Sequence, residues 1–361
     1  MSLPALLRRL PLLLTMLLAG NALAAPGDVR RFPAQGAATA QLCIQGSTDI
    51  EVFAAVIGDY QRLHPHTEVV YQDVIAGDIY RRYLHPGPGP RCADLLISAS
   101  MDLQTKLVND GHALAHRSPQ TEALPAWAQW RHEVFGISYE PVAIVYNTAR
   151  LPAARRCRAP AAGCWNCCAR RARRCVGVSA PTTWSAAAWA TCSRPRTASS
   201  AAWPARCWRR WATTRVVLEE RTGVLLDKVA RGDLLLAYNV LGSYAQARID
   251  AGAPLAIVQP EDYTLVALRT AVIPRDSPHA ADARRFLDYL LSPRGQQGLS
   301  REARLQPILP QPGVAAQGGP AAASAFRPIA LGPGLLVYLD ALKRRQFLDA
   351  WRSSMQQAPP R

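Results

Sequence analysis

The stretch AQLCIQGSTDIEVFAAVIGDYQRLHP (residues 40–65) contains a strand, a polar turn and a helix in direct succession. The apolar run AQLCIQG predicts the strand. IEVFAAVIGDYQRL has apolar residues at helical spacing and ends before Pro65, which predicts the helix. The turn between them is STD, residues 47–49. A strand that leads directly into a helix is the repeating unit of α/β folds.

The same alternation continues further along the chain. TEVVYQDV (67–74) and CADLLISAS (92–100) predict strands, and each is followed by a predicted helix, AGDIYRRYL (76–84) and MDLQTKLVNDGHA (101–113). Strands and helices that alternate at this pace predict a doubly wound α/β sheet.

The second half of the chain has a mixed pattern. Residues 134–147, VFGISYEPVAIVYN, predict two extended pieces around Pro141, and residues 255–277 are again extended. TGVLLDKVARGDLLLAYNVLGSYA (222–245) predicts a helix, a strand and a loop. HAADARRFLDYLLSPRGQQGLS (279–300) predicts one amphipathic helix.

The N-terminus has the features of a secretory signal peptide, for which we expect residues 1–24. Arg8 and Arg9 precede a short apolar core, and the ALA triplet at 22–24 supplies the small-x-small cleavage pattern. The apolar core is too short for a membrane anchor, and no other stretch of about 18 uncharged apolar residues occurs. We therefore expect a soluble mature chain in the periplasm.

The segment 156–214 differs from the rest in composition. The formal charge of the chain is +16, and thirteen arginines lie between positions 155 and 215. No acidic residue occurs between Glu140 and Glu219, and seven of the nine cysteines fall in this segment. The basic character is therefore local, and the remainder of the chain is nearly balanced in charge.

Three interpretations of this segment compete. A zinc site could use the closely spaced cysteines of CWNCCARRARRC (164–175), but no second well-spaced pair follows and exported proteins seldom keep thiols reduced. An arm that binds nucleic acid through arginine and tryptophan conflicts with export. The third interpretation is a frameshift. When the back-translated segment is read in the neighbouring frame, it loses its cysteines and tryptophans and gives peptides such as VGTYDVERSGVGY. We favour the frameshift, and expect residues 156–214 to be irregular and to bind neither metal nor nucleic acid.

Five segments outside this block carry a resemblance to a known family: QGSTD, ADLLISAS, GISYEPVAIVYN, GDLLLAYNVLGSYA and AVIPRDSPHAADARRFLDYLLSPRGQQ. Their order resembles the extracellular solute-binding proteins of bacterial ABC importers, in the branch of ferric-ion, phosphoglycerate and phosphonate binders. The last segment is the most specific. The resemblance covers roughly residues 40–310, and the frameshifted peptide is similar to the family's Asp-x-x-x-Ser-Gly segment.

The resemblance implies an α/β fold of the periplasmic-binding-protein type II-like kind, with two doubly wound α/β lobes joined by two crossover strands. Lobe one would comprise residues 25–141 and 256–312, and lobe two residues 142–255. Residues 313–361 would form a linker and a C-terminal helix. The implied partners are a small solute held between the lobes and an ABC permease in the inner membrane. We expect a monomer without a cofactor. The sequence shows no catalytic constellation, so we do not expect an enzyme.

Solute contacts in such folds lie beyond the carboxyl ends of strands, where helix N-termini present free N–H groups. Helix capping, turn formation and packing are the alternative roles of the same residue types. Glu140, beside Tyr139, also precedes the first crossover strand and is a further possible contact. The candidates for solute binding are Ser47, Thr48, Asp49, Ser98, Ser100, Tyr139, Asn239, Ser243 and Tyr244.

The identity of the solute is left open by the sequence. Iron-binding members of the family carry two adjacent tyrosines where this chain has Ser243 and Tyr244. The loss of one tyrosine favours a small oxyanion, an organic phosphate, phosphonate or carboxylate, over Fe(III), and we predict no metal ligands. A ligand-sensing partner of a membrane histidine kinase is the alternative function. Cys43 and Cys92 could form a disulfide in an oxidising compartment or remain buried thiols.

Overall fold

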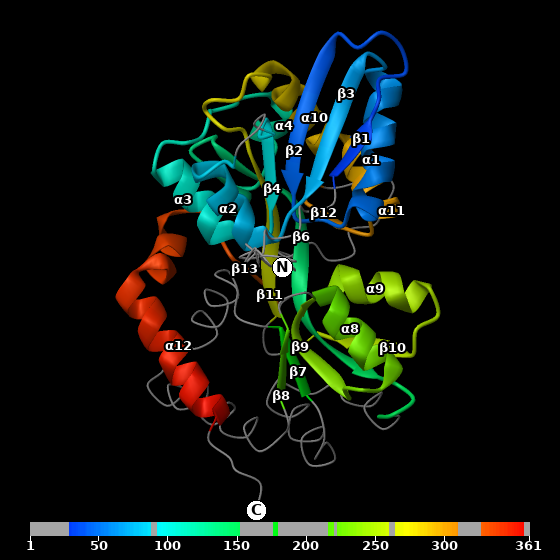
Figure 1. Cartoon of the computed structure of the whole chain (residues 1–361), viewed down its shortest axis with the longest axis vertical. Coiled ribbons are helices and arrows are strands. Elements are labelled where there is room, and N and C mark those ends of the chain that lie inside the picture. Colours follow the sequence, from blue (N-terminus) through cyan, green and yellow to red (C-terminus); the bar gives the residue numbers. More distant parts are fainter. Residues whose placement is uncertain are drawn as a thin grey trace, which may run out of the picture.

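The computed structural model describes residues 29–87, 92–151, 176–179, 216–219, 222–259, 264–309 and 326–356. They form an α/β fold whose strands belong to one 13-stranded mixed sheet. Figure 1 shows two lobes, one above the other. The strands β6 (Val134–Asn147) and β11 (Thr264–Val272) run from one lobe into the other. The predicted α/β fold is confirmed. The predicted signal peptide and the linker at 313–325 lie outside the described residues.

Lobe one is built around three parallel strands in the order β3-β2-β4. The chain passes from β2 to β3 on one side of β2, and then to β4 on the other side. This reversal is the defining feature of a doubly wound sheet. The elements involved are β2 (Ala40–Gly46), α1 (Ile50–Leu63), β3 (Thr67–Asp73), α2 (Ala76–Leu84), β4 (Leu95–Ser98) and α3 (Met101–Asn109), with β1 (Val29–Phe32) antiparallel at the edge.

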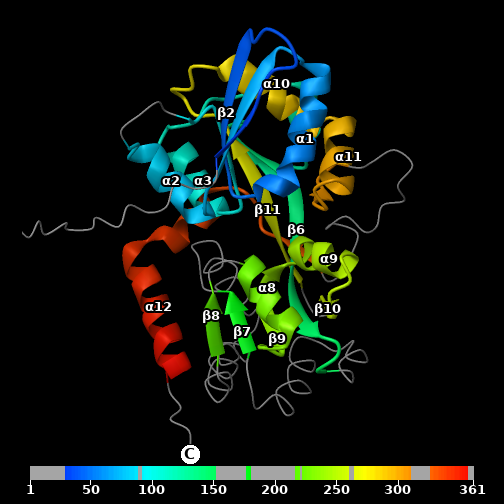
Figure 2. The same ribbon diagram turned by 45° about the vertical axis from the view of Figure 1, so that its right-hand side comes forward.

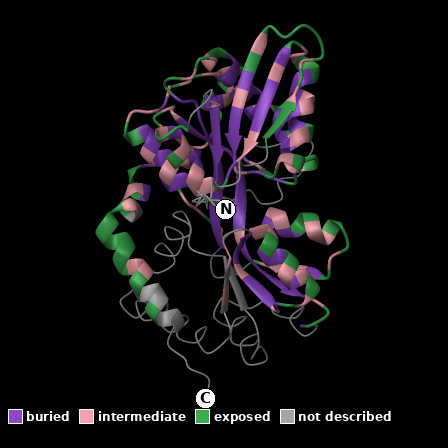
Figure 3. Cartoon of the chain, viewed as in Figure 1, coloured by how far each residue is buried: buried purple, intermediate pink, exposed green. Residues whose placement is uncertain are grey.

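Both faces of this sheet are covered by helices. Leu95 and Ile97 of β4 pack in the large core cluster with residues of α1 and α10 (Ala280–Leu291). Leu96, between them, packs in a second cluster with residues of α2 and α3. Because successive side chains of a strand point to opposite faces, helices must cover both faces of β4. Figure 3 shows the resulting pattern of buried strands and helices with exposed outer faces.

One strand, β6, belongs to both lobes. Its residues from 134 to 141 pair with β11, β5 (Gln129–Trp130) and β12 (Gln306–Pro307). Its residues from 142 to 147 pair instead with β9 (Leu236–Leu241) and β10 (Leu255–Val258). The prediction of two pieces around Pro141 is therefore wrong. Proline lacks only the N–H, so an extended strand can continue through it.

Lobe two repeats the strand order of lobe one. β7 (Val176–Ser179) lies between β8 (Val216–Glu219) and β9, all three parallel. α8 (Thr222–Arg231) leads into β9, and α9 (Gly242–Asp250) follows it where a loop was expected. The predicted irregularity of residues 156–214 is wrong for β7 (Val176–Ser179), whose valines favour a strand. The rest of that block lies outside the described residues.

The C-terminal part of lobe one departs from the sequence prediction at one point. Instead of one helix over 279–300, α10 ends and α11 (Pro293–Arg301) begins at Ser292. Pro293 occupies the first position of α11, and the Ser292 hydroxyl accepts a hydrogen bond from the Gly295 N–H at 3.1 Å. Proline and a serine cap are typical of a helix start, so the Ser-Pro dipeptide ends one helix and begins the next.

The remaining elements are short or peripheral. In Figures 1 and 2, α12 extends alongside lobe two. None of the helices in the described ranges is long and apolar enough to cross a membrane. The predicted limits of the two lobes stay a prediction. The remaining short or peripheral elements of the described residues are α4 (Pro119–Glu122), η1 (Ala126–Ala128), β13 (Phe326–Pro328), η4 (Pro333–Leu339) and α12 (Ala341–Gln356).

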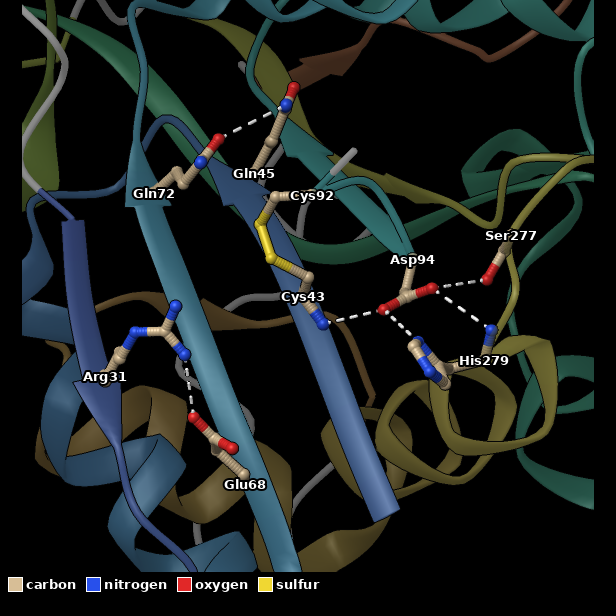
Figure 4. Close-up of a disulfide and its surroundings, with 9 residues drawn as sticks. All are labelled: Arg31, Cys43, Gln45, Glu68, Gln72, Cys92, Asp94, Ser277 and His279. Carbon is tan, nitrogen blue, oxygen red and sulfur yellow. Dashed lines mark hydrogen bonds and ion pairs between the residues drawn. A yellow bond between two sulfur atoms is a disulfide. The ribbon is translucent and has the colours of Figure 1, made fainter. Parts of the chain in front are cut away.

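Cys43 and Cys92 form a disulfide with a Cα–Cα distance of 5.0 Å (Figure 4). Cys43 lies on β2, whereas Cys92 precedes β4 rather than lying in it. The neighbouring Asp94 is buried and accepts hydrogen bonds from the Cys43 N–H at 2.8 Å and from the Ser277 hydroxyl at 2.8 Å. His279 contacts the same carboxylate at 3.0 Å. The disulfide and Asp94 together attach the segment before β4 to β2 and to the start of α10.

We predict that the disulfide contributes substantially to stability. It closes a loop with a sequence separation of 49 residues, which by chain entropy corresponds to about 4 kcal/mol. The double variant Cys43→Ser/Cys92→Ser should lose about that much free energy of unfolding, measured by urea denaturation. The variant should also be less sensitive to added dithiothreitol than the wild type. An unchanged unfolding midpoint would show that this bond does not stabilise the fold.

Candidate functional site

The reversal point of the lobe one sheet lies between the ends of β2 and β4. The Ser47 N–H donates to the Ile97 carbonyl at 3.0 Å, and the Ser47 hydroxyl accepts from the Ala99 N–H at 3.2 Å. These two bonds hold the turns after β2 and β4 side by side. In open α/β sheets, solutes bind at such a reversal point, beyond the carboxyl ends of the strands.

Two helices begin at this point with uncapped N-termini. Asp49 and Ser100 are the N-cap residues of α1 and α3, and neither side chain makes a capping hydrogen bond. Ser100 is 0% exposed, and its hydroxyl has no hydrogen-bond partner among the described residues. Both residue types normally cap their own helix. Because neither side chain caps its helix, both can form a hydrogen bond to a further group near the positive helix ends.

A buried ion pair lies beside these turns. Arg269 of β11 and Glu140 of β6 are 1% and 2% exposed, and Arg269 Nη2 donates to Glu140 Oε1 at 2.7 Å. Arg269 Nη1 donates to the Thr48 hydroxyl at 2.5 Å. Burial lowers the pKa of Arg269, but the Glu140 carboxylate more than offsets this and raises the pKa, so Arg269 stays charged.

Lobe two contributes the first turn of α9. The Ser243 hydroxyl donates to Glu140 Oε2, which extends the contacts of the ion pair into lobe two. Tyr244 follows it, and burial raises the pKa of its phenol to about 12, with Arg269 opposing and the Asp49 and Glu140 carboxylates adding to the rise. Tyr244 is thus an electrostatic neighbour of Asp49 across the two lobes, and is protonated at neutral pH.

The structure brings together most, but not all, of the predicted residues. Ser98 uses its hydroxyl within the fold, since it donates to the Ala76 carbonyl at 3.2 Å and accepts from the Ser100 N–H at 3.0 Å. Tyr139 packs in the core of lobe one. It adjoins Glu140 on the same strand, so the two side chains point to opposite faces. A solute contact by Tyr139 stays an untested prediction.

Asn239 lies at an irregularity of lobe two. The pairing of β6 with β9 shifts between Ala143 and Ile144, opposite Asn239, which has a φ of 61°. Asn239 is 3% exposed, and its Nδ2 has no hydrogen-bond partner among the described residues. Bulges of this kind often redirect side chains beside binding sites.

Arg269 is the residue that the sequence prediction missed. It occurs in the strand TLVALRTAV, every residue of which is buried. A single arginine in a buried strand requires a partner carboxylate. The other crossover strand contains one, Glu140, so the signal was present in the sequence.

The backbone of Thr48 is also fixed by a hydrogen bond from a buried tyrosine. The Tyr71 hydroxyl donates to the Thr48 carbonyl at 2.7 Å, and Tyr71 is fully buried. A Cβ added to Gly46 would lie 2.0 Å from the Tyr71 hydroxyl, so only glycine fits there. Within the described ranges, no group of three or more His, Cys, Asp or Glu side chains is arranged to hold a metal ion.

We predict that Gly46→Ala displaces Tyr71 and lowers the free energy of unfolding by about 1–3 kcal/mol, because the added methyl overpacks the site. Gly58→Ala is the matched control. Gly58 lies inside α1 with nothing within 4 Å of an added Cβ, and the change should stabilise the helix by roughly 0.5–1 kcal/mol. Chemical denaturation of both variants measures the difference. Equal stabilities would contradict the proposed role of Gly46.

Solved structures with the same fold come from transport-related proteins. The substrate-binding protein of an ABC transporter from Agrobacterium tumefaciens is 28% identical, with a TM-score of 0.78 over 91% of this chain and 99% of that one. Fructose-6-phosphate-bound AfuA from Actinobacillus pleuropneumoniae is 15% identical, with a TM-score of 0.65 over 89% and 100%. Iron-bound HitA from Pseudomonas aeruginosa is 12% identical, with a TM-score of 0.65 over 87% and 99%. The last two show a common fold only.

No curated protein matches the sequence significantly. The profile of one family, described as "Bacterial extracellular solute-binding protein", matches residues 44–302, more than half of the chain. This range includes the end of β2, both crossover strands and the first turn of α9. The chain therefore belongs to the family of bacterial extracellular solute-binding proteins.

Proposed function

We propose that this chain is the periplasmic solute-binding component of an ABC importer. It captures a small anionic solute between its two lobes and delivers it, as a monomer, to a permease in the inner membrane. Family membership supports the binding role, and the Agrobacterium protein supports the link to ABC transport. The Cys43–Cys92 disulfide agrees with an oxidising compartment.

The Ser100 hydroxyl is the observation that carries the proposal. A buried hydroxyl without a partner costs about 1–3 kcal/mol, so it persists where a further group supplies the missing bond. Ser100 stands at the N-terminus of α3, at the reversal point of the sheet. An oxyanion there would accept from the Ser100 hydroxyl and would lie at the positive end of α3.

The charges around this point favour an organic anion. Glu140 compensates the charge of Arg269. An anion would therefore be attracted by the positive N-terminal ends of α1 and α3. The exposed Asp49 carboxylate would repel a second anionic group, but it accepts a hydrogen bond from a hydroxyl or amino group. A phosphate ester of a polyol, an aminophosphonate and a hydroxycarboxylate each carry both kinds of group.

An oxyanion fits the site better than Fe(III). Ferric ion prefers tyrosinate oxygens, and the first turn of α9 offers one tyrosine, Tyr244, beside Ser243. Burial raises the pKa of Tyr244 to about 12, so in the solute-free protein its phenol is neutral. The phenol is then a hydrogen-bond donor for an oxyanion. Ser243, its neighbour, already donates to Glu140.

We predict that a small oxyanion raises the melting temperature of the purified chain, and that Ser100→Ala weakens its binding by about tenfold to a hundredfold, the value of a hydrogen bond to a charged group. The panel comprises glycerol phosphate, 2-aminoethylphosphonate, lactate and Fe(III), and isothermal titration calorimetry measures the dissociation constants.

Thr105→Val is the matched control. Thr105 is also 0% exposed with an unpartnered hydroxyl among the described residues, but it lies beyond the first turn of α3. This variant should bind as the wild type does. Equal losses in both variants, or a response to Fe(III) alone, would contradict the proposed site.

A further inference from the structure

A continuous series of side-chain contacts connects the two lobes. Thr48, in the turn after β2, accepts from Arg269 at 2.5 Å, and Arg269 donates to Glu140 at 2.7 Å. Glu140 in turn accepts from Ser243 at the start of α9. The series therefore begins in lobe one, passes through both crossover strands and ends in lobe two. We call it the interlobe series.

The charged pair at its centre is costly unless all its contacts are made. Two charges removed from water lose several kcal/mol of hydration each, and only close partners compensate for this loss. Each Glu140 oxygen has a partner, Oε1 in Arg269 and Oε2 in Ser243. Any rotation of lobe two that moved α9 away from β6 would remove one of these partners from a buried carboxylate.

The backbone is irregular on both sides of this pair. The pairing of β11 with β6 shifts between Arg269 and Thr270, and the pairing of β6 with β9 shifts between Ala143 and Ile144. Between the two shifts lies the regular ladder in which Glu140 faces Ala267. Bulges interrupt the ladder and increase local twist, so bending of the crossover strands would concentrate at these two positions.

We infer that Arg269 and Glu140 are positioning residues. Through Thr48 and Ser243 they align the two halves of the solute site and hold the lobes together before solute arrives. The inference rests on the proposed function for its meaning, but it concerns the solute-free protein. A site aligned in advance binds its solute without first ordering the two halves, which increases affinity.

The test compares solute-free variants by small-angle X-ray scattering and by amide hydrogen exchange. Ser243→Ala removes the contact to lobe two and leaves the ion pair intact. We expect a larger radius of gyration. We also expect amide hydrogen exchange to be about tenfold faster in peptides that span β6 and β11, because one hydrogen bond to a charged group is lost. Ser243→Thr, which keeps the hydroxyl, should restore both values.

Ser277→Ala is the matched control, because it removes a serine hydroxyl from a buried carboxylate, Asp94, within lobe one. It should change neither the radius of gyration nor the exchange of β6 and β11. Glu140→Gln alone leaves Arg269 unpaired and should lower the melting temperature. The double variant Glu140→Leu/Arg269→Met, which removes both charges and the acceptor for Ser243, should recover part of that loss while its lobes stay apart.

Wild-type dimensions and exchange rates in both Ser243→Ala and the double variant would overturn the inference. An equal effect of Ser277→Ala would also overturn it, since the effect would then be general loss of stability. Because no solute is present, these results are independent of the oxyanion panel. A failed panel with an intact response to Ser243→Ala would contradict the proposed solute and leave the interlobe series supported.

Discussion

The sharing of one strand by two lobes is the constraint on which the structure depends. The first part of β6 pairs in the sheet of lobe one, and the last part pairs in the sheet of lobe two. Figure 2 shows β6 and β11 as the elements that run from one lobe into the other. Every residue of β11 is buried, and so are all but one of β6. Charged side chains on these strands must therefore find partners of opposite charge within the protein, which is why Arg269 and Glu140 occur as a pair.

Local patterns were predicted well from the sequence. β2 and α2 have the limits that their apolar spacing indicates, and α1 ends before Pro65 as expected. The errors concern features that depend on distant partners. Pro141 was read as a break, but β6 continues through it because the strand pairs on both of its sides. The helix break at Ser292 was missed because the apolar stripe of α10 outweighed the signal of the Ser-Pro dipeptide.

The candidate site was predicted in part, for the same reason. Residues after the strands of a doubly wound sheet gather at one edge, and this general rule identified Thr48, Asp49 and Ser100. The rule could not predict that the Ser98 hydroxyl donates to the Ala76 carbonyl, because this hydrogen bond depends on where α2 begins. It also missed Arg269, which lies within a strand rather than after one. A search for lone charges in buried strands would have found it.

Lobe two has its own reversal point, between β7 and β9, and the chain that follows Ser179 lies outside the described residues. The candidate site therefore comprises the residues that follow β2 and β4 in lobe one and β9 in lobe two. A crystal structure with a bound phosphate ester tests it most directly. We predict that the phosphate lies within hydrogen-bond distance of the Ser100 hydroxyl, with Ser243 still bonded to Glu140. A solute bound elsewhere, with the Ser100 hydroxyl still unpartnered, would contradict the account.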